Sequence, residues 1–123
     1  MSKFDDGLAV RKAVLGAEFV DKAIASADEF NRPLQELVTE YCWGAIWTRE
    51  GLSLRVRSML NLAMLTALNR PHELKMHVQG ALRNGVTREE IREVLLQATI
   101  YAGVPAGVDA FRVAREAMAD FKE

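Results

Sequence analysis

The sequence contains a single cysteine, Cys42, among 123 residues. One thiol cannot form an internal disulfide, a Cys-x-x-Cys redox pair or a thiolate metal cluster. Long apolar runs are also missing, since no stretch approaches the ~20 apolar residues that a membrane helix needs. The polar first residues, MSKFDD, do not lead into an apolar signal core. We therefore expect a cytoplasmic protein without membrane association.

Net charge is equally scarce, because 16 basic and 17 acidic residues leave a formal charge of -1. Binding of a phosphate backbone needs a basic patch, so nucleic acid is not an expected partner. Half of the residues are hydrophobic and 27% are charged, which is the balance of a soluble globular protein. The length suits one domain with a real core. We expect a single domain over residues 1–123.

Prolines and glycines are few, 3 and 8, and they fall between stretches with a helical hydrophobic period. Thr87 and Glu90 have the spacing of a capping box, which marks the start of a helix. The stretch 54–68 is apolar almost all round, so we expect it to be mostly buried. No strand-like alternation competes, and the sequence predicts an all-α fold of six to seven helices. The predicted helices cover residues 5–15, 17–30, 33–50, 54–68, 71–84, 87–101 and 106–121.

Glu73 and His77 are four residues apart in the predicted helix 71–84, which places them on one face at the edge of an apolar stripe. A carboxylate beside an imidazole raises the basicity of the imidazole and orients it, which suits general acid–base catalysis. An ordinary surface ion pair explains the same spacing. His72 points to a different face and needs no functional reading.

Arg57 and Asn61 share a face of the mostly apolar helix 54–68. A guanidinium on a largely buried helix needs a partner, which is either a protein carboxylate or an anionic ligand. Both alternatives stay open for Arg57. Arg55 points elsewhere, and we expect it to be exposed to solvent.

Trp43 and Trp47, again four apart, form an aromatic face that ends close to Arg49. Such residues belong to a core or an interface, or they line a substrate pocket. The residues alone therefore suggest a pocket with an acid–base pair and an arginine, but they do not select a reaction.

Several segments together resemble the γ-carboxymuconolactone decarboxylase family, within the alkylhydroperoxidase-like superfamily. The similarity covers about residues 9–120 and is specific in combination. It is carried by RKAVLG (11–16), WGAIWTREGL (43–52), RSMLNLAML (57–65), ELKMH (73–77), NGVTREEI (84–91) and IYAGVPA (100–106).

The resemblance implies an alkylhydroperoxidase-like helical domain that assembles as a homohexamer. It also implies decarboxylation of 4-carboxymuconolactone, a small dicarboxylate lactone, to 3-oxoadipate enol-lactone in the β-ketoadipate pathway of protocatechuate catabolism. Counting back from His77, the two cysteines of the superfamily's thiol peroxidases would fall at Arg70 and Glu73. Without these thiols, peroxidase chemistry is excluded.

Decarboxylation leaves an electron pair on carbon, and in this lactone the pair can move through the ring double bond onto the carbonyl oxygen. Because the substrate is its own electron sink, no cofactor and no metal are expected. The protein must bind two carboxylates, stabilise the oxyanion and protonate carbon.

We assign carboxylate binding to Arg57 first and to Arg49 second, and the walls of a dry pocket to Trp43 and Trp47. Proton transfer falls to His77, which Glu73 orients and keeps charged. Two alternatives remain open: a related enzyme that handles or isomerises another small carboxylic acid, and a binding or assembly protein without catalysis.

Overall fold

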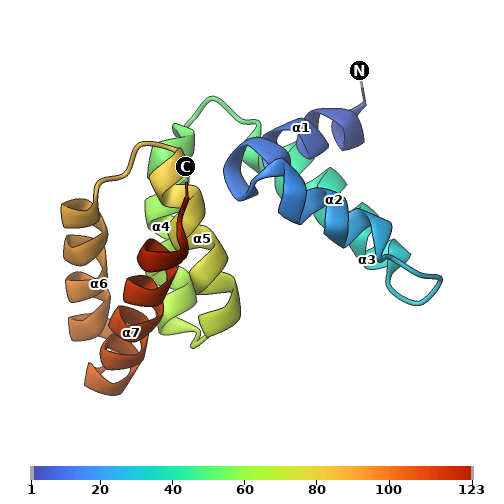
Figure 1. Cartoon of the computed structure of the whole chain (residues 1–123). Coiled ribbons are helices and arrows are strands. Elements are labelled where there is room, and N and C mark those ends of the chain that lie inside the picture. Colours follow the sequence, from blue (N-terminus) through green and yellow to red (C-terminus); the bar gives the residue numbers. More distant parts are fainter. Residues whose placement is uncertain (1, 123) are drawn as a thin grey trace. The chain divides into compact units, whose positions relative to one another are not determined.

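A computed structural model describes residues 2–122 of the chain (Figure 1). These residues form seven α-helices and one π-helix, with no strand among them, which confirms the predicted all-α class. The chain divides into two compact units, the first ending at Ser53 and the second beginning at Leu54. None of the helices described is long and apolar enough to cross a membrane.

The first unit contains α1 (Lys3–Leu15), α2 (Ala17–Ala25), α3 (Arg32–Leu37) and the π-helix η1 (Val38–Trp47). Helix α1 ends at Gly16, whose φ of 93° lies in the region that favours glycine. Helix α1 packs closely on η1, and each helix has a glycine at the contact. A Cβ at Gly7 would meet backbone atoms of Thr39 and Gly44, so the two helix backbones touch.

A buried arginine connects α1 to the junction of α3 and η1. Arg11 is only 6% exposed, and its Nη1 donates to Gln35 Oε1 at 3.0 Å and to Thr39 Oγ1 at 3.2 Å. Thr39 is itself fully buried at the start of η1. Neutral acceptors satisfy part of the guanidinium, and desolvation lowers the pKa of Arg11.

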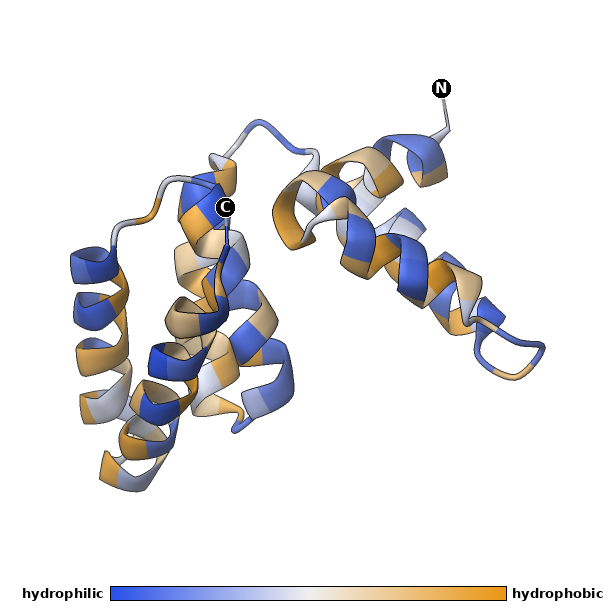
Figure 2. Ribbon diagram, in the orientation of Figure 1, coloured by the Kyte–Doolittle hydropathy of each residue, from blue (hydrophilic) through white to orange (hydrophobic). Residues whose placement is uncertain are grey.

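The second unit is a four-helix bundle of α4 (Leu54–Ala67), α5 (Pro71–Arg83), α6 (Arg88–Ala102) and α7 (Val104–Asp120). Helix α4 packs on α5 and α6, and α7 packs on the same two helices from the opposite corner. In Figure 2 the side of α6 that faces the other helices of the unit carries hydrophobic residues. The core residues are Leu62, Leu74, Val78, Ala81, Val86, Ile91, Leu95, Ala110, Val113, Ala114 and Ala117.

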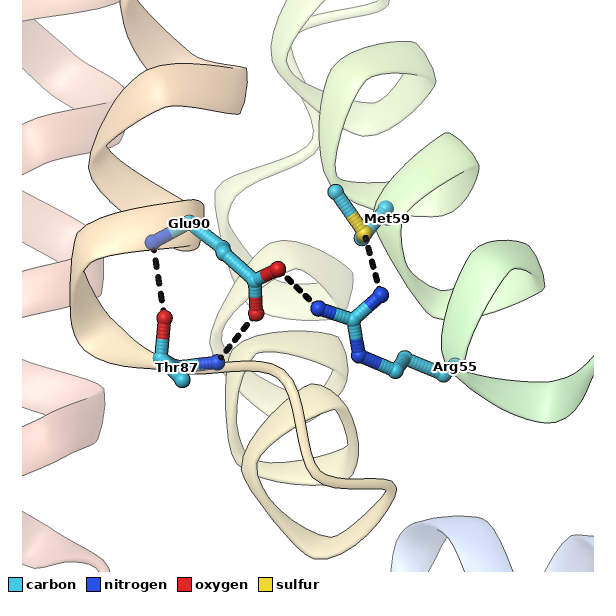
Figure 3. Close-up of polar contacts among 4 residues, drawn as sticks. All are labelled: Arg55, Met59, Thr87 and Glu90. Atoms are coloured by element: carbon cyan, nitrogen blue, oxygen red, sulfur yellow. Dashed lines mark hydrogen bonds and ion pairs between the residues drawn. The ribbon is translucent and has the colours of Figure 1, made fainter.

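The capping box at the start of α6 is present and has a second function (Figure 3). Glu90 N donates to Thr87 Oγ1 at 3.0 Å, and Thr87 N donates to Glu90 Oε1 at 2.9 Å. The other oxygen of Glu90 pairs with Arg55 of α4. Arg55 also approaches the Met59 sulfur at 3.9 Å. Arg55 is partly exposed to solvent, as expected, but the folded bundle also brings the α6 cap to it as a partner.

Two helix predictions in the first unit are wrong. The helix expected over 17–30 ends at Ala25, because Asp28 accepts hydrogen bonds from the backbone N–H groups of Phe30 and Asn31 and so stabilises a turn. The helix expected over 33–50 becomes a π-helix from Val38. Its pitch changes where Arg11 and the α1 backbone contact it, and hydrophobic spacing does not report such tertiary contacts.

Helix α4 is less buried in its unit than its apolar sequence indicates. Leu60 is 46% exposed and Met64 is 51% exposed. This face borders a groove of about 700 Å³ between α4 and α6. The groove is lined by Arg55, Val56, Met59, Leu60, Ala63, Met64, Ala67, Val94, Gln97, Ala98, Tyr101 and Ala102.

We predict that Gly7→Ala destabilises the protein although alanine is the better helix former. The added Cβ overlaps backbone atoms, which cannot rotate away, so the free energy of unfolding should fall by about 2 kcal/mol. Gly51→Ala is the matched control, since no atom lies within 4 Å of its Cβ. Urea unfolding of both variants measures the difference, and equal stability of the two would contradict the close packing of α1 on η1.

A second prediction separates the two functions of Glu90. Glu90→Gln keeps a side chain that can complete the capping box but loses the ion pair with Arg55. Because the Arg55 side chain is over one-third exposed, the free energy of unfolding should fall by less than about 1 kcal/mol. Glu90→Ala removes both functions and should cost about 0.5–1 kcal/mol more. The variants are compared by urea unfolding. A larger loss for the glutamine variant than for the alanine variant is inconsistent with this division.

Candidate active site

His77 lies on the face of α5 that turns toward the bundle core, between the buried residues Leu74 and Val78. It is 9% exposed, whereas His72 on the same helix is exposed to solvent. Glu73 is half-buried one turn before His77, and its charge acts on the imidazole. The carboxylate and the imidazole predicted to act together therefore do lie within electrostatic range.

The charge state of His77 differs from the prediction. Burial lowers the pKa of His77 from 6.5 to about 4, and the negative charge of Glu73 only partly opposes this. The imidazole is therefore neutral at pH 7. The expectation that Glu73 keeps His77 charged is wrong, because desolvation by the core outweighs the attraction of one half-buried carboxylate.

Asn61 of α4, which the sequence places on one face with Arg57, is a neighbour of His77. Asn61 Nδ2 lies 3.5 Å from His77 Nδ1. The four-residue spacing from Arg57 was the available signal, and it places the two α4 residues on one face. The contact shows that this face of α4 points toward His77. Arg57 is half-buried one turn before Asn61.

A second buried polar contact joins α4 to the end of α5. Asn84 Nδ2 donates to Ser58 Oγ at 2.9 Å, and Ser58 is fully buried beside Arg57. The sequence indicated Asn84 only as a helix end. The contact satisfies a buried hydroxyl and fixes the position of α4 against α5.

The remaining predicted site residues belong to the first unit. Trp43 and Trp47 stack with ring centroids 4.6 Å apart and are buried within that unit. Arg49 is exposed just after η1. The roles of Trp43 and Trp47 as pocket walls and of Arg49 in carboxylate binding stay predictions.

Cys42 is also in the first unit and differs from a reactive thiol. Partial desolvation raises the pKa of Cys42, against the opposing effects of Arg11 and of a hydrogen bond with Trp47. A protonated thiol is a poor nucleophile at neutral pH. Among residues 2–122, no three or more His, Cys, Asp or Glu side chains are grouped as a metal ion would require.

The groups around His77 define what this part of the molecule can do. A neutral imidazole donates one hydrogen bond without a net charge, and the amide of Asn61 on α4 lies beside it. Arg57 lies one turn before Asn61 on α4 and carries a cation, and Glu73 lies one turn before His77 on α5 and carries an acid–base group. The 700 Å³ groove is lined by none of these residues and is mostly apolar, so we place the candidate chemistry at His77 and not in the groove.

Comparison with known proteins identifies the family. A sequence model of the carboxymuconolactone decarboxylase family matches residues 32–116. The chain is 44% identical to the nitrosuccinic acid decarboxylase of Metarhizium robertsii over 117 residues, which cover 95% of this chain and 82% of the relative. It is 37% identical to the 4-carboxymuconolactone decarboxylase of Acinetobacter baylyi over 118 residues, which cover 96% and 88%. The chain is a decarboxylase and belongs to the carboxymuconolactone decarboxylase family.

Proposed function

We propose that this enzyme decarboxylates a small dicarboxylic acid in which the carbon that loses CO₂ is conjugated or bonded to an electron-accepting group. The observation that carries the proposal is the buried, neutral His77, contacted by Asn61, on helices that also supply Arg57 and Glu73. Two similar decarboxylases support the reaction type.

The first candidate substrate is 4-carboxymuconolactone, as the sequence predicts and as the Acinetobacter relative acts on. The bond between the ring carbon and the carboxylate breaks, CO₂ leaves, and the electron pair moves through the ring double bond onto the lactone oxygen. Protonation of carbon then returns the pair and gives 3-oxoadipate enol-lactone. This reaction would place the enzyme in the β-ketoadipate pathway.

The second candidate is nitrosuccinic acid, which is favoured by the 44% identity to the Metarhizium enzyme. Its nitro group is attached to a carbon that also carries a carboxylate. Loss of CO₂ puts the electron pair on that carbon, and the nitro oxygens accept it as a nitronate before a proton adds to carbon. Both candidates have two carboxylates and an internal electron sink, so neither reaction needs a cofactor to accept electrons.

The side chains divide this chemistry between them. Arg57 binds the carboxylate that stays, because a guanidinium donates two parallel hydrogen bonds to it. His77, being neutral, donates its N–H to the oxygen that receives the electron pair, and this hydrogen bond strengthens as negative charge develops. Glu73 is the remaining acid–base group, and we assign to it a proton relay: the carboxylate takes up one proton from solvent and then transfers it to carbon, which returns Glu73 to the carboxylate.

The roles proposed for residues of the first unit come from the sequence. Arg49 is the second choice for carboxylate binding, and Trp43 and Trp47 are proposed to shield the substrate from water. We also propose that the enzyme is cytoplasmic and that it forms a homo-oligomer, for which the family resemblance implies a hexamer. Residues 1–123 are proposed to be a single domain. Exposed apolar residues such as Ile100 and Val104 are consistent with self-association.

We predict CO₂ release from 4-carboxymuconolactone by the purified protein without an added cofactor. Arg57→Met should raise KM about 10- to 100-fold, the value of one charge-assisted carboxylate contact. His77→Gln should lower kcat about 100- to 1,000-fold, as loss of an oxyanion donor does. Arg115→Met, on the exposed side of α7, is the control and should behave as the parent.

The two candidate substrates are compared in the same assay. Turnover of nitrosuccinic acid alone would select the second candidate. If neither acid releases CO₂, or if His77→Gln retains full activity, the proposed function is wrong.

We further predict that stability depends on pH through His77. The unfolded chain binds a proton at this residue below about pH 6.5, whereas the folded protein binds it only near pH 4. The free energy of unfolding should therefore fall by up to about 3 kcal/mol as pH decreases across this window. His77→Gln should remove this dependence, and His72→Gln, at an exposed position, should retain it. Urea unfolding at several pH values tests this, and equal slopes for both variants would contradict a buried neutral His77.

A further inference from the structure

The contact between Asn61 and His77 has consequences for the proton on the imidazole. The Nδ2 of Asn61, on α4, is 3.5 Å from Nδ1 of His77, on α5. An amide NH₂ group can only donate hydrogen bonds, whereas a ring nitrogen accepts one only when it carries no proton. With the amide nitrogen facing the ring, this contact is a hydrogen bond only for a ring whose Nδ1 is unprotonated and whose single proton is on Nε2.

Both partners are held by the helices that carry them. Asn61 precedes Leu62, which is fully buried in the core, and His77 lies between Leu74 and Val78. The contact of Asn84 with Ser58 fixes α4 against α5 nearby. Because the two backbones are packed in one bundle, the helices that carry the amide and the ring keep a fixed spacing.

We propose that Asn61 is a positioning residue that holds the ring of His77 in the tautomer protonated at Nε2. The inference about the ring needs no substrate. Its catalytic consequence rests on the proposed function: the hydrogen bond that His77 donates to the developing oxyanion comes from Nε2. With the other tautomer, the ring would present an acceptor lone pair at that atom, which repels an oxyanion.

The tautomer can be read directly from the ¹⁵N chemical shifts of the ring. The chain has two histidines, so His72→Gln leaves His77 as the only imidazole signal. We expect a protonated Nε2 and an unprotonated Nδ1 in this protein at pH 7. A protonated Nδ1 would overturn the proposal, because it would require the amide oxygen to face the ring.

Asn61→Asp is the sharpest variant because it reverses the hydrogen bond. A carboxylate can only accept, so it should move the ring proton to Nδ1, and together with Glu73 it should raise the pKa of His77. Asn69→Asp introduces the same charge at an exposed position and should leave the ring signals unchanged. Changed ring signals in Asn69→Asp would contradict the proposal, and so would an unchanged tautomer in Asn61→Asp.

Asn61→Leu covers the case in which the aspartate variant does not fold. Leucine has a similar shape and no donor, so the ¹⁵N shifts of the ring should move away from those of a ring protonated only at Nε2. With an active substrate, kcat should fall about tenfold while KM stays unchanged. Unaltered shifts and kcat would refute the proposal. If the tautomer is as expected but neither acid is decarboxylated, the proposed function fails and the positioning of the ring stands.

Discussion

Burial of an imidazole between two packed helices is the constraint on which the candidate site depends. The core that encloses His77 removes water from the ring, and charging the ring then costs more than one half-buried carboxylate returns. A neutral ring has one donor and one acceptor, so its function depends on which nitrogen carries the proton. Asn61 lies against one of these nitrogens, and this makes α4 as important to the site as the helix that carries the histidine.

A neutral donor suits a decarboxylase whose substrate provides the electron sink. The transition state places new negative charge on an oxygen of the substrate, and a fixed N–H in a dry surrounding stabilises that charge without reorganising. An imidazolium ion would also attract the carboxylate that must leave, and so would stabilise the ground state together with the transition state. The low pKa of His77 therefore agrees with the proposed chemistry better than the charged acid first expected.

The second unit has two distinct surfaces with different physical character. Asn61 and Glu73 act on His77, while the groove between α4 and α6 is apolar and is bordered at one end by the Arg55–Glu90 ion pair. Tyr101 and Ile100, 86% and 78% exposed, extend this apolar surface along α6. Water contact at such residues is unfavourable, which is consistent with the self-association proposed above.

The sequence by itself determined features that depend on residues close together along the chain. The all-α class followed from hydrophobic spacing, the start of α6 from the Thr87–Glu90 box, and the shared face of Glu73 and His77 from a separation of four. The tertiary structure decided the charge state of His77, its neighbour Asn61 and the partner of Arg55. Solvation and hydrogen-bond partners depend on helices that are distant in sequence, and a local pattern contains no information about which helices will pack together.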